Sequence, residues 1–554
     1  MQLGKLKIIP LGGIGEIGKN MTVLEYEDTI IIIDCGLGFP DEDMLGIDLV
    51  IPDTTYLEKN KEKIKGLFLT HGHEDHIGAI PYMLRSINPP IYGTPLTLGI
   101  VKNKLEEFNL PMKPALKQVK AGDIIQCGSF SVEFIHVNHS IADACCLSIR
   151  TPVGTIVHSG DFKLDLTPIE GEVMNIGRLA QIGREGVLLL MCESTNAERP
   201  GYTPSEKTVG QSLEYIFRMH PDKRLIIATF SSNVHRVQQI INASVNHRRK
   251  VAVIGRSMLN ILAAAIELGY MKVPDGTIIN AAEIKNYKPE ELTVITTGSQ
   301  GEPMSALYRM TFNDHAQVRI GNSDVVVLSS SAIPGNEKTV GNIINELAHK
   351  GIPVIHDAAL AVHVSGHACR EELKLMHAIL KPRFFMPVHG EYRHLLAHRD
   401  LALEMGMPSD SIMVGEIGQV LELTPKSAVW NGRVEAGSVM VDGNGIGDVG
   451  NVVLRDRWHL AQDGMVVVVA TIDSYEKTLI SGPDITSRGF VYIKESEALM
   501  NDVKAFTQRI ILDCLEDSPQ DRMTIKNQIR ESLGQYLYDR VGRKPMIFPF
   551  IMNI

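Results

Sequence analysis

The sequence predicts an α/β protein with several domains, and three observations carry this prediction. With 554 residues, the chain is too long for one hydrophobic core, so two to four domains are expected. Short β-type runs separated by glycine and aspartate turns fill residues 1 to about 200. From about residue 205, helical stretches alternate with buried strand runs, a pattern typical of βαβ units on a parallel sheet.

The individual elements follow from the period of the apolar residues. Strands are predicted in the first part at 7–9, 21–26, 30–33, 130–135 and 155–158, with helices near 78–86 and 97–108. In the second part, helices are predicted at 206–219, 234–245 and 257–268, and strands at 224–228, 251–254, 294–296 and 325–328. The last hundred residues predict strands at 465–472 and 490–493, helices at 495–516 and 522–541, and an apolar end at 545–554.

Composition narrows the class of protein. The chain is 44% hydrophobic and 22% charged, which is ordinary for a globular protein, and it lacks the stretch of about 18 apolar residues that crosses a bilayer. Its seven cysteines include no Cys-x-x-Cys pair, which argues against a disulfide framework and a thiolate zinc site. A cytoplasmic location without membrane contact is therefore expected. The formal net charge of −10 argues against a large basic surface but leaves room for a local basic groove.

The most specific motif is the segment 71–76, which reads His-Gly-His-Glu-Asp-His and follows an apolar run. Neutral imidazole nitrogens and carboxylate oxygens are the ligands that borderline metals such as Zn²⁺ prefer. The segment therefore predicts a metal site with hydrolytic chemistry.

Distant residues must complete such a site. His139, Asp161 and His389 each lie just past a strand-like run. Side chains in loops at strand ends can converge on one rim of a sheet. Either histidine alone would more often be an ordinary core or surface residue, but together with the 71–76 cluster they favour a shared site.

This set of residues resembles the metallo-β-lactamase fold, an αββα sandwich with a two-metal site. The resemblance implies that His71, His73 and His139 hold one metal. It implies that Asp75, His76 and His389 hold the second, with Asp161 between the two. Asp34, after the strand at 30–33, matches the acid that supports the ligand loop in that family.

Further motifs identify the chain as a member of the β-CASP group of nucleic-acid-processing enzymes. The segment 192–195, Cys-Glu-Ser-Thr, matches the acidic motif before the inserted domain, and 364–367 and 387–391 match the two later histidine motifs. The segments 11–20, 297–304 and 479–485 resemble bacterial ribonuclease J, and this likeness runs from about residue 5 to the C-terminus.

The resemblance implies the domain organisation. Residues 1–205 would form the first part of the metallo-β-lactamase domain, and 206–350 an inserted β-CASP α/β domain. Residues 351–450 would close the β-CASP domain, return to the lactamase fold and lead into a linker. Residues 451–554 would form a small C-terminal α/β domain that helps to build a homodimer or homotetramer, with a paralogous subunit as a further candidate partner.

The implied activity is metal-dependent ribonuclease action, both 5′→3′ exonucleolytic and endonucleolytic, in RNA maturation and decay. Two Zn²⁺ per subunit are expected, with Mn²⁺ or Mg²⁺ as alternatives, because a close metal pair supplies hydroxide and neutralises phosphate charge. Asp75, His367 and Glu193 are the candidate catalytic residues. His367 would protonate the leaving oxygen or stabilise its charge. Glu193 would orient a neighbouring group, and the alternative for Glu193 is a helix-capping or surface acid.

The resemblance also implies a pocket for the 5′-monophosphate end of single-stranded RNA. Loop-to-helix positions rich in hydroxyls and small residues suit phosphate. Plain helix capping is the alternative for residues 231–233. The candidate pocket residues are Ser231, Ser232, Asn233, His235, His363, Val364, Ser365, Gly366 and His367.

A second cation site is a weaker candidate. The acidic, glycine-rich loop 442–448 lacks the later ligands of an EF-hand. Asp442, with Asp48, would bind Ca²⁺ in this interpretation, and a tight turn is the favoured alternative.

Three other functions compete. The segment Gly-Ile-Gly-Glu-Ile-Gly at 13–18 imitates a dinucleotide-binding fingerprint of an NAD-dependent oxidoreductase. Residues 20–26, however, alternate like a strand, so a β-hairpin is predicted where that fold needs a helix. A non-catalytic RNA-binding paralogue would have lost metal ligands, and the sequence keeps all seven. Another metallohydrolase of the same fold would lack the β-CASP motifs.

Overall fold

The computed structural model describes seven ranges of the chain: 4–169, 171–302, 304–333, 336–356, 360–491, 497–517 and 522–554. Pro303 in the 297–304 segment, and Tyr492 and Ile493 of the predicted strand at 490–493, lie outside these ranges. The chain forms two compact units, one from Met1–Phe39 and Leu49–Val439, and the other from Pro40–Asp48 and Met440–Ile554. No helix among the described residues is both long and apolar enough to span a membrane.

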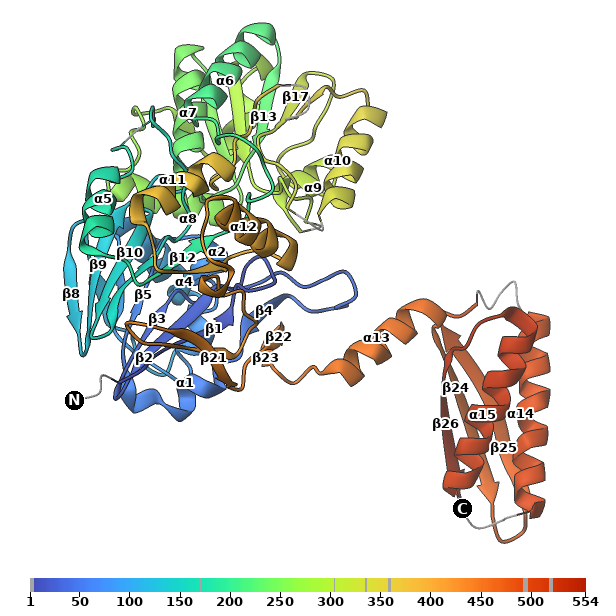
Figure 1. The fold of residues 1–554 in the computed structure, drawn as a ribbon. Coiled ribbons are helices and arrows are strands. Elements are labelled where there is room, and N and C mark those ends of the chain that lie inside the picture. Colours follow the sequence, from blue (N-terminus) through green and yellow to red (C-terminus); the bar gives the residue numbers. More distant parts are fainter. Residues whose placement is uncertain are drawn as a thin grey trace. The chain divides into compact units, whose positions relative to one another are not determined.

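The first unit begins with a mixed eight-stranded sheet (Figure 1). Antiparallel pairing joins its first half, and β3, β5, β6 and β7 are parallel to one another. The strands, in sheet order, are β21 (Ala428–Arg433), β20 (Gln419–Leu423), β1 (Leu6–Gly12), β2 (Met21–Tyr26), β3 (Thr29–Ile33), β5 (Ile64–Phe68), β6 (Ile91–Gly93) and β7 (Leu116–Gln118).

The glycine-rich segment 13–18 lies between two antiparallel strands. Gly12 of β1 pairs with Met21 of β2, and Tyr26 of β2 pairs with Thr29 of β3. The predicted hairpin is therefore confirmed, and no helix follows the glycines as a dinucleotide-binding unit would require.

A second, six-stranded sheet faces the first. The pairings from β8 through β9 and β10 to β11 are antiparallel, whereas β11, β12 and β19 are parallel to one another. The strands, in sheet order, are β19 (Phe384–Val388), β12 (Leu189–Glu193), β11 (Gly154–His158), β10 (Cys145–Thr151), β9 (Phe130–His136) and β8 (Ile124–Cys127).

The two sheets enclose one core, and helices cover their outer faces. Phe68 of the first sheet stacks on Tyr92 at 4.8 Å between ring centroids and lies 6.2 Å from Phe134 of the second sheet. Helix α4 (Pro95–Glu106) packs on β6 and β7. Helices α5 (Ile176–Glu185), α11 (Arg370–Leu380) and α12 (Tyr392–Glu404) bury apolar residues against the other face of the second sheet. This αββα sandwich is the predicted fold.

The inserted part of the chain forms a six-stranded sheet in which every pairing is parallel. Its strands are β15 (Ile278–Ile279), β14 (Lys250–Ile254), β16 (Leu292–Thr296), β13 (Arg224–Ala228), β17 (Asp324–Leu328) and β18 (Val354–Ile355), in sheet order. Its helices are α6 (Lys207–Met219), α7 (Val234–Asn246), α8 (Arg256–Glu267), α9 (Ala306–Thr311) and α10 (Glu337–His349). The predicted alternation of helices and strands is confirmed.

The second unit contains a three-stranded sheet and two long helices. The strands are β25 (Thr478–Arg488), β24 (Met465–Asp473) and β26 (Met546–Asn553), and the long helices are α14 (Glu497–Asp517) and α15 (Arg522–Val541). Helix α13 (Asn451–Asp463) and the hairpin of β22 (Ser438–Asp442) with β23 (Gly445–Ile446) precede them. Strand β26 lies parallel to β24 and accounts for the apolar end of the chain.

The strand predicted at 490–493 is wrong for its described residues. Strand β25 ends at Arg488, which pairs with Met465, the first residue of β24. Phe490 therefore has no facing residue on β24, and it packs into the core of the unit.

We expect Phe68→Ala to lower the free energy of unfolding by about 3–5 kcal/mol, because it empties the contact between the two sheets. Phe39→Ala, at a side chain that is 65% exposed, should change it by less than about 0.5 kcal/mol. Denaturant titration followed by tryptophan fluorescence and circular dichroism measures both. Equal effects of the two substitutions would contradict the assigned core.

Candidate metal centre

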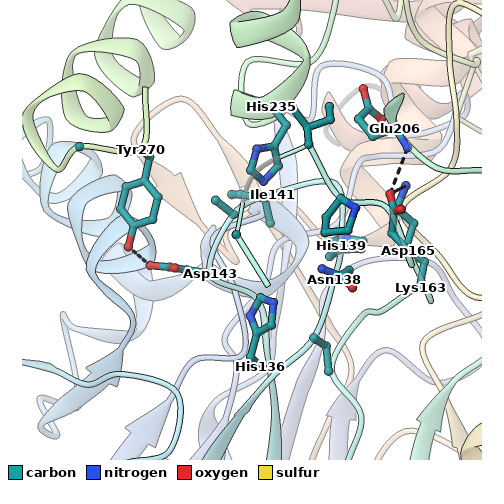
Figure 2. A pocket seen from close by; sticks show the side chains of 16 residues that line it. His136, Asn138, His139, Ile141, Asp143, Lys163, Asp165, Glu206, His235 and Tyr270 are labelled. Carbon is teal, nitrogen blue, oxygen red and sulfur yellow. Dashed lines mark hydrogen bonds and ion pairs between the residues drawn. The ribbon is translucent and has the colours of Figure 1, made fainter. Parts of the chain in front are cut away.

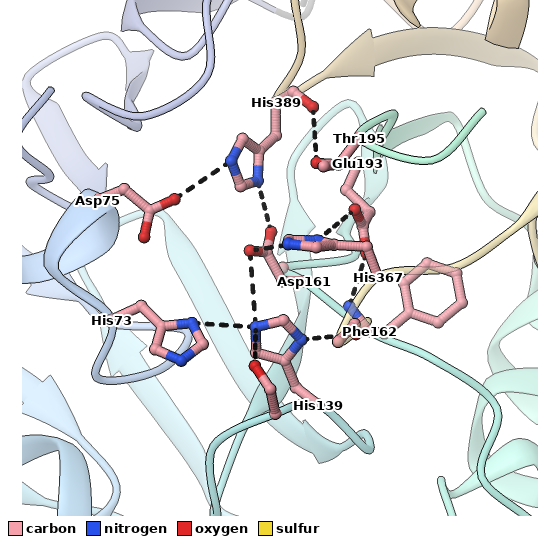
Figure 3. Close-up of polar contacts among 12 residues, drawn as sticks. His73, Asp75, His139, Asp161, Phe162, Glu193, Thr195, His367 and His389 are labelled. Carbon is pink, nitrogen blue, oxygen red and sulfur yellow. Dashed lines mark hydrogen bonds and ion pairs between the residues drawn. The ribbon is translucent and has the colours of Figure 1, made fainter. Parts of the chain in front are cut away.

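The histidine and acidic side chains predicted to bind metal converge at the ends of strands from both sheets (Figure 3). The 71–76 segment follows β5 and begins the short helix α2 (Glu74–Ile77). His139 follows β9, Asp161 follows β11, and His389 follows β19. The structure therefore brings together residues that are more than 300 positions apart in the sequence.

Three histidines form the first group of side chains. The Nδ1 atom of His73 lies 3.1 Å from Nε2 of His71 and 3.0 Å from Nε2 of His139. Burial lowers the pKa of all three imidazoles, that of His73 to about 4. Near neutral pH the rings are therefore uncharged, which is the form that binds a metal.

Two carboxylates and two histidines form the second group. The Nε2 atom of His76 lies 3.2 Å from Asp161 Oδ2, and His389 Nε2 lies 3.2 Å from Asp75 Oδ2. Asp161 Oδ2 is also 3.7 Å from Nε2 of His71, in the first group. The Asp161 carboxylate therefore lies between the two groups.

Two buried polar atoms at this point, Asp161 Oδ2 and His389 Nε2, make ion-pair contacts at 3.2 Å but have no hydrogen-bond partner among the described residues. Such atoms are costly inside a protein unless a ligand satisfies them. Burial acts to raise the pKa of Asp161, but His389 and His76 hold it well below its usual range, so the carboxylate is charged. The donor set therefore fits divalent cations with imidazole and carboxylate ligands.

Residues around the site hold the ligand rings in one orientation. Asp34 Oδ2 lies 2.8 Å from Nδ1 of His76, and Asp34 accepts hydrogen bonds from the amide and hydroxyl of Thr70, both at 2.8 Å. His139 donates from Nδ1 to the carbonyl of Gly366 at 2.7 Å. These contacts keep protons on Nδ1, so Nε2 is the nitrogen of each ring that would bind a metal.

Glu193 and His367 form a pair beside the metal ligands. Glu193, at the end of β12, is buried, so it is not a surface acid. Its Oε2 lies 2.8 Å from Nδ1 of His367, and its Oε1 accepts the amide of Phe162 at 2.9 Å. His367 Nδ1 is also 3.7 Å from Asp161 Oδ2. Burial acts to lower the pKa of His367, and the charge of Glu193 raises it above the ordinary value.

The candidate phosphate residues lie on two segments of the chain. Ser231, Ser232 and Asn233 connect β13 to α7, and Asn233 caps α7 by accepting the amide of Arg236 at 3.0 Å. The capping interpretation thus holds for Asn233. The second segment, 363–367, precedes α11 and contains the buried residues Val364 and Gly366.

The second segment is tied to its surroundings by hydrogen bonds. Ser365 Oγ accepts from Nδ2 of Asn196 at 2.8 Å and from the amide of His367 at 3.2 Å. His363 Nδ1 lies 3.0 Å from Nη1 of Arg236, which belongs to α7. Arg236 therefore connects the two segments.

A cavity of about 270 Å³ adjoins His139 between the lactamase-type part and the inserted part of the first unit (Figure 2). His136 and His235 line it, and on one side Tyr270, which follows α8, hydrogen-bonds to Asp143 (Figure 2). Sequence reasoning placed His235 near the substrate but gave no sign of this cavity.

Several buried charged residues near the site were missed by sequence reasoning. Arg236 is fully buried within the apolar face of α7. Because an arginine is almost never fully buried without a partner, its position in an apolar stretch could have predicted a buried acidic partner. Lys163 and Asp165 lie two and four positions after Asp161 and are also buried. Lys163 contacts Asp165, but their other partners, Pro204 and Glu206, lie about 40 positions away, which is why the pattern alone could not identify this network.

The carboxylates proposed for a second cation site already have partners in the second unit. Asp48 accepts the amide of Gly443 at 2.7 Å, and Asp442 hydrogen-bonds to Arg457. Gly443 adopts a positive φ of 57° in the turn between β22 and β23. The tight-turn interpretation accounts for all of these contacts.

Comparison with known families covers most of the chain. Residues 14–225 match the metallo-beta-lactamase superfamily, and 222–347 match the ribonuclease J beta-CASP domain. Residues 351–412 match a Zn-dependent metallo-hydrolase RNA specificity domain, and 452–554 match the ribonuclease J C-terminal domain.

Curated relatives match over the full chain. Ribonuclease J2 of Bacillus subtilis is 43% identical, with 99% of each chain covered. Ribonuclease J of Thermus thermophilus is 44% identical over 99% of this chain and 95% of its own. A solved structure, a protein of unknown function from Enterococcus faecalis, matches with a TM-score of 0.53 at 19% identity, covering 76% of this chain and 100% of that one. This last likeness shows the fold alone.

We expect Asp34→Asn to weaken metal binding by about 10–100-fold, because the amide would place an N–H group opposite the Nδ1 proton of His76. Competition with a zinc-chelating dye measures the affinity. Asp28→Asn, in the exposed turn between β2 and β3, is the matched control and should leave the affinity unchanged. Equal affinity of the two variants would show that Asp34 does not support the site.

Proposed function

The chain belongs to the ribonuclease J family and is a metal-dependent ribonuclease, and we propose that it cleaves single-stranded RNA by 5′→3′ exonucleolysis from a 5′-monophosphate end and also by internal cleavage. One observation supports this proposal most directly. The buried atoms Asp161 Oδ2 and His389 Nε2, which have no hydrogen-bond partner among the described residues, lie in a cluster of seven metal-type ligands that adjoins Glu193 and His367.

We assign two metal ions to this cluster, with Zn²⁺ preferred and Mn²⁺ or Mg²⁺ as alternatives. His71, His73 and His139 would hold one ion; Asp75, His76 and His389 would hold the other. Asp161, which lies between the groups, would contact both. When bound, such ions act as Lewis acids that activate a water and neutralise phosphate charge.

The protein's own residues then orient the phosphodiester and move a proton. Glu193 holds His367 by its Nδ1 atom, so the Nε2 atom of the ring remains to protonate the leaving oxygen of the cleaved bond. Phe162 and Ala368 donate their amides to Glu193 and keep its carboxylate in place. In this assignment Glu193 positions His367 and does not itself contact RNA.

The 5′ end of the RNA would bind beside this centre, at the segments 231–235 and 363–367. The first segment leads into the N-terminus of α7, a helix of 13 residues, whose positive dipole end favours an anion. Ser231, Ser232, His235, His363 and Ser365 offer further polar groups. Asn233, whose side-chain oxygen caps α7, would hold this segment in shape.

We also propose that the protein acts in the cytoplasm as a homodimer or homotetramer. None of the seven cysteines, all within the described ranges, forms a disulfide, which suits a reducing compartment. The assembly is assigned to the second unit, whose sheet exposes Phe550 and Met552 on the side opposite its helices.

We expect His76→Ala and Asp161→Ala each to reduce RNA cleavage by more than about 100-fold, while RNA binding persists. Loss of a residue that only supports a metal ligand costs roughly 10–100-fold, and loss of a ligand should cost more. End-labelled RNA with a 5′-monophosphate or a 5′-triphosphate, with and without chelator, is the substrate. Wild-type protein should degrade the monophosphate RNA faster, and chelator should stop cleavage. His349→Ala, at an exposed helix end, is the control. Undiminished cleavage by the Asp161 variant would refute the site.

Removing residues 451–554 tests whether the second unit forms the proposed oligomer. A chain that ends near residue 450 should have a lower oligomeric state by light scattering than the full chain. An oligomer of unchanged order would place the interface elsewhere.

A further inference from the structure

A buried arginine joins the two segments of the proposed phosphate pocket. Arg236 is fully buried and forms a two-pronged ion pair with Glu206, with Nε–Oε1 at 2.6 Å and Nη2–Oε2 at 2.7 Å. Its remaining nitrogen, Nη1, donates to the carbonyl of Ser329 at 2.7 Å and lies 3.0 Å from Nδ1 of His363. All three guanidinium nitrogens therefore have partners.

The contact with His363 determines the location of that ring's proton. A guanidinium group only donates hydrogen bonds and stays protonated in proteins. Nδ1 of His363 must therefore be the acceptor and carry a lone pair, so the proton of the neutral ring is on Nε2. Burial, together with the nearby charge of Arg236, lowers the pKa of His363 to about 3, which agrees with a neutral ring.

We infer that Arg236 is a positioning residue, which fixes His363 as an uncharged Nε2–H donor for the 5′-phosphate of RNA. This inference rests on the proposed function of the 363–367 segment. Without Arg236, the ring could place its proton on Nδ1 and offer a lone pair to the phosphate, which repels an anion. The positive charge of Arg236 itself is matched by Glu206 and does not reach the substrate directly.

The same ion pair is anchored to the chain that carries Asp161. The amide of Glu206 donates to Asp165 Oδ2 at 3.1 Å, and Lys163 Nζ lies 3.8 Å from the same oxygen. Both residues follow Asp161 within four positions. The network therefore ties the pocket to the metal centre, and its loss should affect recognition of the 5′ end more than the chemical step.

The test compares cleavage of RNA with a 5′-monophosphate and RNA with a 5′-hydroxyl. Removing one partner of a buried ion pair destabilises a protein, whereas replacing both by apolar residues of similar size is often tolerated. The variant is therefore the double substitution Arg236→Met with Glu206→Leu, checked for folding by thermal unfolding. We expect KM for monophosphate RNA to rise roughly 10–100-fold, the cost of one hydrogen bond to a charged group. The kcat value and the cleavage of hydroxyl RNA should change little.

Two substitutions of His363 distinguish the role of its N–H donor from the role of its ring. His363→Gln keeps an N–H group near the position of Nε2 and should retain most of the preference for monophosphate RNA, whereas His363→Leu should lose it. Nitrogen-15 NMR of the histidine rings, assigned with His363→Leu, should show the proton on Nε2 in wild-type protein and a changed signal in the double variant.

The outcomes distinguish this inference from the proposed function. If wild-type protein treats monophosphate and hydroxyl RNA alike, the proposed pocket is wrong. If wild-type protein prefers the monophosphate and the folded double variant keeps the full preference, Arg236 has no positioning role. If the double variant unfolds, an Nδ1 proton on His363 in wild-type protein would still overturn the inference, and an Nε2 proton would support it.

Discussion

The rest of the site depends on one constraint, which is that the buried carboxylate of Asp161 needs partners on every side. Its Oδ1 atom lies 2.7 Å from Nδ1 of His389. Its Oδ2 atom lies 3.2 Å from Nε2 of His76 in an ion pair but has no hydrogen-bond partner among the described residues. A charged oxygen of this kind persists in a protein interior only where cationic partners surround it. The loops after β5, β9, β11 and β19 must therefore bring their side chains together around this carboxylate. The two sheets fix the positions of these loops.

The sheet order explains how a whole domain can be inserted without disturbing this convergence. Strands β12 and β19 are parallel neighbours, and Glu193 at the end of one pairs in register with Val388 at the end of the other. The chain leaves the sandwich after Glu193, forms the inserted sheet, and returns through α11 to the adjacent position. Both crossings occur beside the metal ligands, so the inserted domain lies where it can add Arg236 and His235 to the surroundings of the site.

Much of this arrangement could be predicted from the sequence, because the signals were local or belonged to a family motif. The 71–76 cluster, the hairpin after Gly12 and the alternation after residue 205 were of this kind. The segment 490–493 has the composition of a strand. Strand β24 begins at Met465, however, and Met465 already pairs with Arg488, so β24 has no residue left to pair with this segment. The ion pair of Arg236 with Glu206 was not predictable, since its members are 30 positions apart and no local pattern links them.

The matched charges of Arg236 and Glu206 have a consequence for the way RNA approaches the protein. A guanidinium whose charge is balanced by a carboxylate inside the fold creates little field at a distance and displaces no condensed counterions from the nucleic acid. In the proposed pocket, capture of the 5′ end through His363 would then act only at hydrogen-bonding range. In this proposal, the salt sensitivity of RNA binding would come from lysines and arginines outside the pocket, so ionic strength and 5′-end chemistry should act on the affinity as nearly independent variables.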